Sequence, residues 1–203
     1  MIDLNPVAVR RKRSKHTVPA TAPASPPVWP LPGLNGRSPV VLDGNPKSPG
    51  VELAYRRENE SDLLTIYPAG GANGSNTHFM PNLIPAYAVR DGEIIYAGKH
   101  AIVVDHRNGW ATYYANLEHV FAMPTDERPR RRPEHVKAGD VLGYIGSSAA
   151  GMLKCLHFEL WKRDEEMHFN PIDPSAEMRS WLVLPWTDDR LTPTESATQK
   201  RAA

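Results

Sequence analysis

The chain has 203 residues, 40% hydrophobic and 23% charged, which is enough for one globular domain with extensions. A formal net charge of +1 argues against a general electrostatic attraction to nucleic acid, and a single cysteine rules out an internal disulfide. No apolar segment follows the basic start, so we expect no ordinary signal peptide, no membrane span, and synthesis in the cytoplasm.

Residues 1–33 are predicted to form an extended, basic, proline-rich arm. The chain has 20 prolines, about twice the usual share, and those at positions 19, 23, 26, 27, 30 and 32 favour polyproline segments. Because the arm has no self-contained apolar pattern, we expect it to be ordered only against another chain. Basic residues crowd its start and recur at 128–132. Such basic clusters are most often solvated tails or loops. The more specific interpretation is that they bind an anionic partner surface.

The stretch from residue 34 to residue 178 is predicted to be one domain of the mainly β class. Short apolar segments separated by turn residues predict strands at 40–42, 50–55, 84–89, 93–97, 101–105, 110–114, 141–145 and around His157. Asp91-Gly92 and Asn108-Gly109 each predict a β-hairpin. Residues 115–121 could give one helical turn, and residues 179–203 are predicted to be a polar C-terminal tail.

The stretch Cys155–Trp161 alternates polar and apolar side chains, which predicts a β-strand with two different faces. Cys155 and His157 share one face, and Leu156, Phe158 and Leu160 share the other. A strand with an apolar face and a metal-capable pair opposite it is a suitable position for a site.

Four stretches, in chain order, resemble the LytM/lysostaphin-type zinc endopeptidase family. They are 50–53, 85–94, 110–117 and 136–146, and the last continues into Leu156-His157-Phe158-Glu159. The resemblance covers residues 35–175. It implies a compact antiparallel β-sheet or sandwich with a groove, as in that family.

The resemblance also implies which groups the family's chemistry needs. A His-x-x-x-Asp segment and the second His of a His-x-His strand bind zinc, and two further histidines flank the metal. Position by position, Ser48 replaces the ligand His, Glu52 the ligand Asp, Asn116 the His of Tyr-x-His-Leu, and Cys155 the first His of His-x-His. Only His157 is unchanged. A serine hydroxyl is a poor zinc ligand and an asparagine cannot act as a general base, so no catalytic set is intact.

Some capacity for metal remains in these positions. Cys155, His157 and Glu52 are each zinc ligands by type and could form a rebuilt site. We favour the plainer interpretation of a domain without a cofactor, in which His157 hydrogen-bonds in the groove and Cys155 packs as a small hydrophobe. Tyr114, His157 and Glu159 are the residues expected to contribute to binding in the groove.

An alternative register places His78 and Asn82 at the His-x-x-x-Asp positions. No Gly-apolar-acidic strand follows His78, whereas Gly50-Val51-Glu52 follows Ser48, so the register at Ser48 is preferred. In either register the metal site is degraded.

The other histidines are expected to be surface residues, at positions 100, 106, 119, 135 and 168. Trp161, Trp181 and Trp186 are expected to cap the core or to dock the tail.

The sequence thus predicts a catalytically inactive, peptidase-like structural component of a phage-tail-like or contractile injection particle, such as its baseplate. This setting is an analogy with other members of the family. Residues 1–33 would contact other subunits, and the domain would contact peptidoglycan. The alternatives are an active zinc peptidoglycan endopeptidase with a rebuilt site, and a regulator of cell-wall amidases. The second alternative is weakened because no export signal or coiled coil is found.

Overall fold

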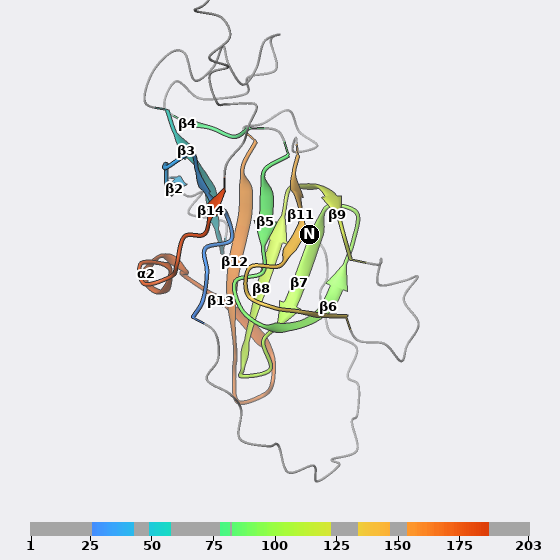
Figure 1. The fold of residues 1–203 in the computed structure, drawn as a ribbon. Helices are drawn as coiled ribbons and strands as arrows, with labels where there is room; N and C mark the ends of the chain where they lie inside the picture. The colour runs from blue at the N-terminus through green and yellow to red at the C-terminus, as the bar shows by residue number, and fades with distance from the viewer. Residues whose placement is uncertain are drawn as a thin grey trace, which may run out of the picture.

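The computed structural model describes residues 26–42, 49–57, 78–81, 83–122, 134–146 and 154–186 (Figure 1). The strands are β1 (Gly33–Leu34), β2 (Pro39–Leu42), β3 (Val51–Arg56), β4 (His78–Phe79), β5 (Pro85–Tyr87), β6 (Gly92–Ala97), β7 (Ala101–Asp105), β8 (Trp110–Ala115), β9 (Leu117–Val120), β10 (Glu134–Val136), β11 (Val141–Ile145), β12 (Leu156–Arg163), β13 (Phe169–Ile172) and β14 (Pro185–Trp186). Between β13 and β14 lies the short helix α2 (Ser175–Met178). The expected mainly β class is confirmed. No helix of the described residues is long and apolar enough to cross a membrane.

The larger sheet is antiparallel and has the strand order β10-β6-β7-β8-β12-β3-β2, with β13 also paired to β12 and β4 to β3. The predicted hairpin at Asn108-Gly109 is confirmed, because β7 pairs with β8 directly across it. Arg107 and Gly109 both have positive φ values, 61° and 87°, as a tight hairpin turn requires. In this turn the Asp105 carboxylate accepts a hydrogen bond from the Arg107 N–H at 2.7 Å.

The predicted hairpin at Asp91-Gly92 is wrong. Strand β5 pairs with β11 in a smaller sheet, whereas β6 pairs with β7 and β10 in the larger one. The Asp91 carboxylate accepts a hydrogen bond from the Ala138 N–H at 2.9 Å, which fixes the chain where it passes between the sheets. An Asp-Gly pair indicates a turn but does not decide which strands pair on either side of it.

The helical turn expected over 115–121 is also wrong, because this stretch forms strand β9. Asn116 takes the left-handed conformation, with φ of 65°, and separates β8 from β9. Asparagine tolerates this conformation better than most residues do. Strand β9 then pairs with β11, which completes the smaller sheet β5-β11-β9.

Both terminal segments extend this smaller sheet. Residues 28–30 run antiparallel to 87–89, since the Val28 N–H donates to the Val89 carbonyl and the Tyr87 N–H to the Pro30 carbonyl, each at 2.9 Å. On their other side they meet 182–186 in parallel, where the Trp29 N–H donates to the Leu182 carbonyl at 2.8 Å and β1 pairs with β14. Figure 1 shows these blue and red segments side by side.

The packing of 26–33 corrects the expectation that the whole arm 1–33 is ordered only against another chain. Leu31 is fully buried, and Val28 and Leu34 are almost fully buried. The prolines that suggested a detached arm are compatible with an edge segment, which needs few N–H donors. Residues 1–25 lie outside the described part. Likewise 179–186, expected to be tail, belong to the packed unit, because Trp181 is 94% buried.

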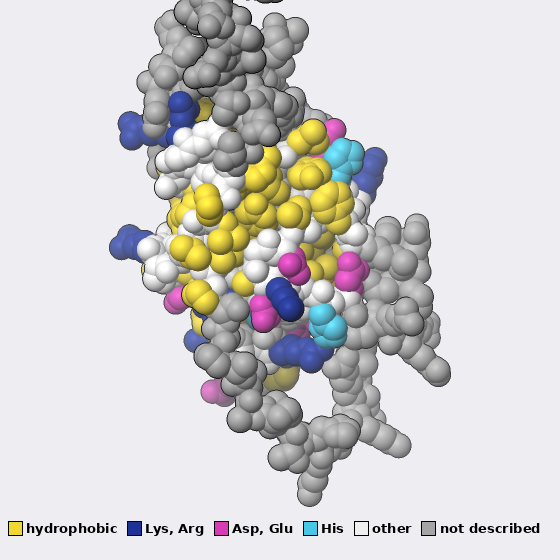
Figure 2. All heavy atoms as spheres, in the orientation of Figure 1, with side chains coloured by type: hydrophobic (Ala, Val, Ile, Leu, Met, Phe, Trp, Pro, Cys, Tyr) yellow, Lys and Arg dark blue, Asp and Glu magenta, His cyan; other side chains and the backbone are white. Residues whose placement is uncertain are grey.

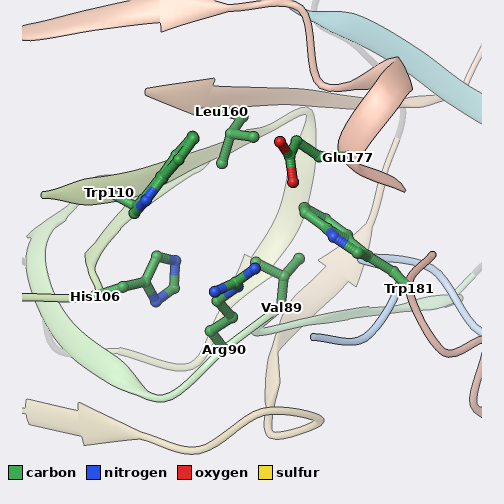
Figure 3. A pocket seen from close by; sticks show the side chains of 7 residues that line it. All are labelled: Val89, Arg90, His106, Trp110, Leu160, Glu177 and Trp181. Atoms are coloured by element: carbon green, nitrogen blue, oxygen red, sulfur yellow. The ribbon is translucent and has the colours of Figure 1, made fainter. Parts of the chain in front are cut away.

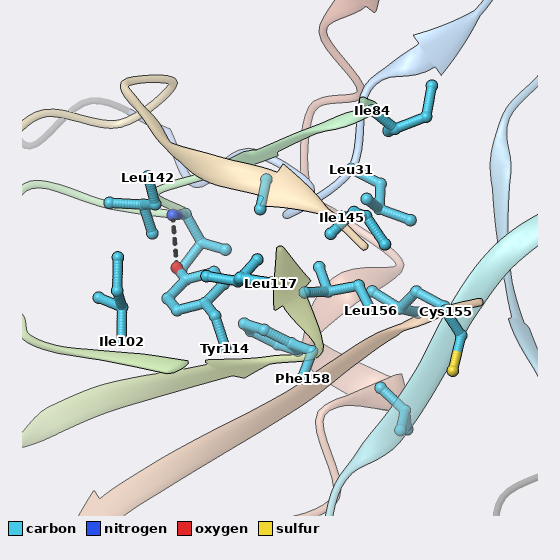
Figure 4. Packing of buried hydrophobic residues seen from close by; sticks show 14 of the residues in the cluster. Leu31, Ile84, Ile102, Tyr114, Leu117, Leu142, Ile145, Cys155, Leu156 and Phe158 are labelled. Atoms are coloured by element: carbon cyan, nitrogen blue, oxygen red, sulfur yellow. Dashed lines mark hydrogen bonds between the residues drawn. The ribbon is translucent and has the colours of Figure 1, made fainter. Parts of the chain in front are cut away.

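The core lies between the two sheets and is built from aromatic and aliphatic side chains. Figure 4 shows Tyr114 beside Phe158, whose rings meet edge to face at a centroid distance of 5.4 Å. Phe158 also meets the edge of Trp181, with 6.0 Å between the ring centroids. Trp181 therefore caps the core as expected, and Trp186 is partly buried against it. The outer face of the smaller sheet stays apolar over β5, β11 and β9, with Phe121 and Val141 exposed (Figure 2).

Candidate functional site

Strand β12 presents the two faces that its sequence predicts. Leu156, Phe158 and Leu160 are buried in the core. Cys155, which directly precedes the strand, and His157 lie on the opposite face, where both contact Glu52. The same alternation carries this polar face onward to Glu159 and Trp161.

The pairing of β3 with β12 brings Glu52 to the site. His157 and Glu52 are directly opposite in the antiparallel register. Gly50 makes this approach possible, because a Cβ atom there would lie 2.5 Å from the Phe158 carbonyl oxygen and 2.6 Å from the Glu159 Cγ. A larger residue at position 50 would therefore clash with β12, which explains the glycine two residues before Glu52. Ser48, which the resemblance aligns with a ligand histidine, lies outside the described residues.

Four side chains on this face form one hydrogen-bonded row. His157 donates from Nδ1 to a Glu52 oxygen at 2.8 Å and from Nε2 to a Glu159 oxygen at 2.8 Å. The second Glu52 oxygen accepts from the Cys155 thiol at 2.8 Å. The second Glu159 oxygen accepts from the Trp161 indole N–H at 2.6 Å. Carboxylates only accept, so a ring with a carboxylate at each nitrogen is an imidazolium.

The charge states follow from burial and from these bonds. Burial opposes the charge of His157, but the hydrogen bonds to Glu159 and Glu52 outweigh it and raise its pKa to about 9. Burial would raise the pKa of Glu52, yet the bonds from His157 and Cys155 prevail and lower it. Burial raises the pKa of the Cys155 thiol, and the carboxylate of Glu52 raises it further. At neutral pH the row thus contains a Cys155 thiol, a His157 imidazolium and a Glu52 carboxylate.

Stability should therefore fall as the solution becomes alkaline. The folded pKa of His157, about 9, lies above its unfolded value near 6.5, so its contribution is complete below pH 6.5 and is lost between pH 6.5 and 9. The titratable groups that face the ring are Glu52 and Glu159, which are hydrogen-bonded to it, and Tyr113, which meets it edge-on; the Cys155 thiol bonds to Glu52. Urea unfolding between pH 6 and about 9.5 tests this, with His157→Gln as the control that should flatten the curve. A wild-type curve as flat as the variant's would contradict it.

These residues do not fit a zinc ion as the family binds it. Zinc needs deprotonated sulfur or a free imidazole nitrogen, and here the thiol keeps its proton while both nitrogens of His157 donate to carboxylates. Asn116, which the resemblance aligns with a histidine, offers only a weak contact of 3.8 Å from its amide to the Cys155 sulfur. Within the described residues no group of three or more His, Cys, Asp or Glu is arranged to hold a metal.

The alternative register at His78 gains no support from the fold. His78 pairs with Arg56 in β3, and Arg56 lies four residues beyond Glu52 along the same strand. That separation is roughly 13 Å at the usual rise of a β-strand. Asn82 lies outside the described residues. His78 is therefore not brought to the row around His157.

Two predicted roles need correction. Tyr114, expected to bind in the groove, is fully buried on the core side of β8, where its hydroxyl accepts from the Val89 N–H at 3.0 Å. His106, expected at the surface, is 8% exposed and contacts the Asp91 carbonyl and the Thr112 hydroxyl. The remaining histidines of that group are exposed as expected: His100, His119, His135 and His168.

Two aromatic residues on the polar face were not predicted to belong to the site. Tyr113 lies opposite Glu159 in the register of β8 with β12. Its ring is nearly parallel to that of Trp161, with a centroid distance of 5.7 Å and an angle of 11°, and it meets the ring of His157 edge-on at 5.9 Å. For Trp161 the alternation of side chains along the strand could have indicated this, because it places residues 157, 159 and 161 on one face.

The fold and this row together define a peptidase-like β domain with a hydrogen-bonded row of Cys155, Glu52, His157 and Glu159 on one face of its larger sheet. Residues 74–173, about half of the chain, match the sequence model of peptidase family M23, the family that includes the LytM and lysostaphin type, and this stretch is a peptidase M23 domain. The matched region contains Asn116, Cys155 and His157, whereas Glu52 precedes it.

The chain is also similar to individual proteins along part of its length. The chain is 29% identical over 134 residues to the cell division protein DipM of Caulobacter vibrioides, covering 61% of this chain and 20% of that protein. A peptidase M23 structure from Pseudomonas aeruginosa has 16% identity and a TM-score of 0.48, covering 80% of this chain and 56% of that one. The lysostaphin catalytic domain of Staphylococcus simulans has 19% identity and a TM-score of 0.44, covering 77% and 92%. The chain thus spans about a fifth of its matched relative DipM.

Proposed function

We propose that this M23 domain contacts cell-wall peptidoglycan without hydrolysing it. The observation that carries the proposal is the state of His157, whose two ring nitrogens both donate to carboxylates. A hydrolytic zinc site needs three ligands with free electron pairs and an open fourth position. Here the surviving histidine serves as an internal cation instead. Asn116 supplies no general base.

The same face supports contact with a polymer. Tyr113 and Trp161 are partly exposed and nearly parallel, and Glu52 keeps 31% of its side chain exposed. Flat rings beside carboxylates suit a chain that offers C–H groups and N–H donors, which both the peptide and the glycan parts of peptidoglycan do. The charge network holds this face in one arrangement without a bound ion.

The experiment measures zinc content, binding and cleavage on one preparation. After incubation with zinc and dialysis, the wild-type protein is expected to retain less than stoichiometric metal, to sediment with insoluble peptidoglycan, and to release no soluble fragments. The combined variant Ser48→His, Asn116→His and Cys155→His is expected to gain zinc and some cleavage, because it restores the ligand and base types. Stoichiometric zinc with cleavage by the wild-type protein would overturn the proposal. Failure to sediment would overturn the contact with peptidoglycan.

Within this proposal the finer setting is a structural part of a phage-tail-like or injection particle. Its support is analogy together with the proline-rich basic N-terminus. Because residues 26–33 pack on this chain's own sheet, contact with other subunits would fall to residues 1–25, outside the described part. A regulatory role in the cell envelope is the second candidate, favoured by similarity to a cell division protein. Recovery with purified particles supports the first setting, and recovery with the cell-wall fraction supports the second.

A further inference from the structure

A buried chain of hydrogen bonds ties the connection between β5 and β6 to the larger sheet. Nδ1 of His106, which directly follows β7, lies 2.9 Å from the Asp91 carbonyl, and Nε2 lies 3.0 Å from the Thr112 hydroxyl. The Thr112 hydroxyl lies 3.1 Å from that of Tyr114, which accepts from the Val89 N–H at 3.0 Å, the bond drawn dashed in Figure 4. Both ends of the chain therefore lie on the β5–β6 connection, and its middle lies on the larger sheet.

The protons of this chain match its contacts only while the histidine ring is neutral. A carbonyl oxygen only accepts, so the proton of a neutral His106 is on Nδ1, and Nε2 accepts. The hydroxyls of Thr112 and Tyr114 and the Val89 N–H then supply one proton for each of the three contacts between Nε2 and Val89. An imidazolium adds a proton on Nε2, so that one of four donors has no acceptor. Because Thr112 and Tyr114 are fully buried, that donor is left without solvent, which costs free energy.

The charges around His106 come from three elements. Arg90 and Asp91 belong to the β5–β6 connection, Asp105 ends β7, and Glu177 of α2 lines the same hollow as the ring (Figure 3). Burial lowers the pKa of His106. The hydrogen bond to the Asp91 carbonyl and the carboxylates of Asp105 and Asp91 oppose this only in part, and the charge of Arg90 adds to it. His106 is 8% exposed and borders the hollow, so a proton from solvent can reach it.

We propose that His106 is an acid-operated latch, whose protonation breaks the hydrogen-bond chain and releases the β5–β6 connection from the larger sheet. The Val89 carbonyl accepts from the Val28 N–H at 2.9 Å, so release is expected to loosen the pairing of the N-terminal segment as well. The folded pKa of His106 lies below its unfolded value near 6.5, so the stabilisation is complete above pH 6.5 and is lost as the pH falls below it. The latch is independent of the proposed contact with peptidoglycan, because none of its residues belongs to the row around His157.

Amide hydrogen exchange of the full chain, followed by nuclear magnetic resonance, tests the latch between pH 6.5 and 5. The protection of the Val89 amide, taken relative to its intrinsic exchange rate at each pH, is expected to fall at least ten-fold across this range. The Ile145 amide donates to the Ile84 carbonyl in the smaller sheet, outside the chain, and should keep its protection. The pKa of Glu52 is lowered below its ordinary 4.5 and that of His157 is raised to about 9, so neither group titrates in this range.

Matched variants separate the latch from general packing. His106→Gln removes the titrating ring and should abolish the response of the Val89 amide to pH. Thr112→Val keeps the shape of its side chain but interrupts the chain, so the ring should still titrate while the Val89 amide no longer responds; Thr112→Ser keeps the hydroxyl and should keep the response. If Thr112→Val does not fold, His106→Gln alone decides. Equal protection of the Val89 amide at pH 6.5 and 5 overturns the proposal, as does an equal loss at Ile145 or a full response in either His106→Gln or Thr112→Val.

Discussion

Replacing His157 by glutamine is expected to lower the free energy of unfolding by about 3 kcal/mol at pH 7. The substitution removes the cation shared by Glu52 and Glu159 and leaves two carboxylates at a site where the His157 side chain is only 14% exposed. A free-energy loss of similar size follows from the pKa of His157, which is about 9 in the folded protein and ordinarily 6.5, because each pKa unit corresponds to about 1.4 kcal/mol. Urea unfolding followed by tryptophan fluorescence measures the loss.

Two controls identify the cause of that loss. His168 lies near carboxylates at 3.7 and 4.0 Å but is exposed, so His168→Gln should change stability by less than about 0.5 kcal/mol. Glu159→Gln keeps the shape of its side chain and removes one carboxylate charge. Combined with His157→Gln, it should cost less than the sum of the single variants, because the two side chains interact directly. Additive effects, or a loss below about 1 kcal/mol for His157→Gln, would mean that the ring is a neutral bystander.

The site could be predicted from sequence where strand parity decided the outcome. Alternation along β12 assigned Leu156 and Phe158 to the core and His157 to the opposite face, and the structure agrees. What alternation could not give is the protonation of His157. That depends on Glu159, two residues along the same face, and on Glu52, supplied by β3 through long-range pairing. The sequence could suggest replaced ligands, but the hydrogen bonds of His157 with Glu52 and Glu159 are found only in the structure.

The packing of the N-terminal segment 28–34 against the segment 182–186 could not be predicted from local sequence pattern, because the two segments are far apart in the chain. Residues 28–34 pair in parallel with 182–186, and nothing in either segment indicates a partner so far away in the chain. Proline-rich composition is shared by detached arms and by edge segments, so it does not separate the two. The burial of His106 and Tyr114 was also missed, because it depends on contacts with residues distant in the sequence, such as Asp91 and Phe158. The hairpin at Asn108-Gly109 was predictable because its turn residues and its strands are neighbours in sequence.

If residues 26–33 are part of the core, Leu31→Ala should destabilise the domain by about 2–5 kcal/mol. Leu31 is fully buried within the main hydrophobic cluster, so truncation leaves a cavity in addition to losing apolar contact. Urea unfolding again measures the change. The midpoint should move to lower urea while the slope stays the same, since the folded unit keeps its extent.

Pro26→Ala is the matched control in the same segment, because Pro26 is exposed and should change stability by less than about 0.5 kcal/mol. A detached arm would make the two substitutions equally harmless, and that outcome would contradict the packing of this segment on its own chain. A large loss for Leu31→Ala alone places the start of the folded unit ahead of residue 31. Contact with other subunits through the N-terminus would then be confined to the residues before the segment that pairs with 87–89.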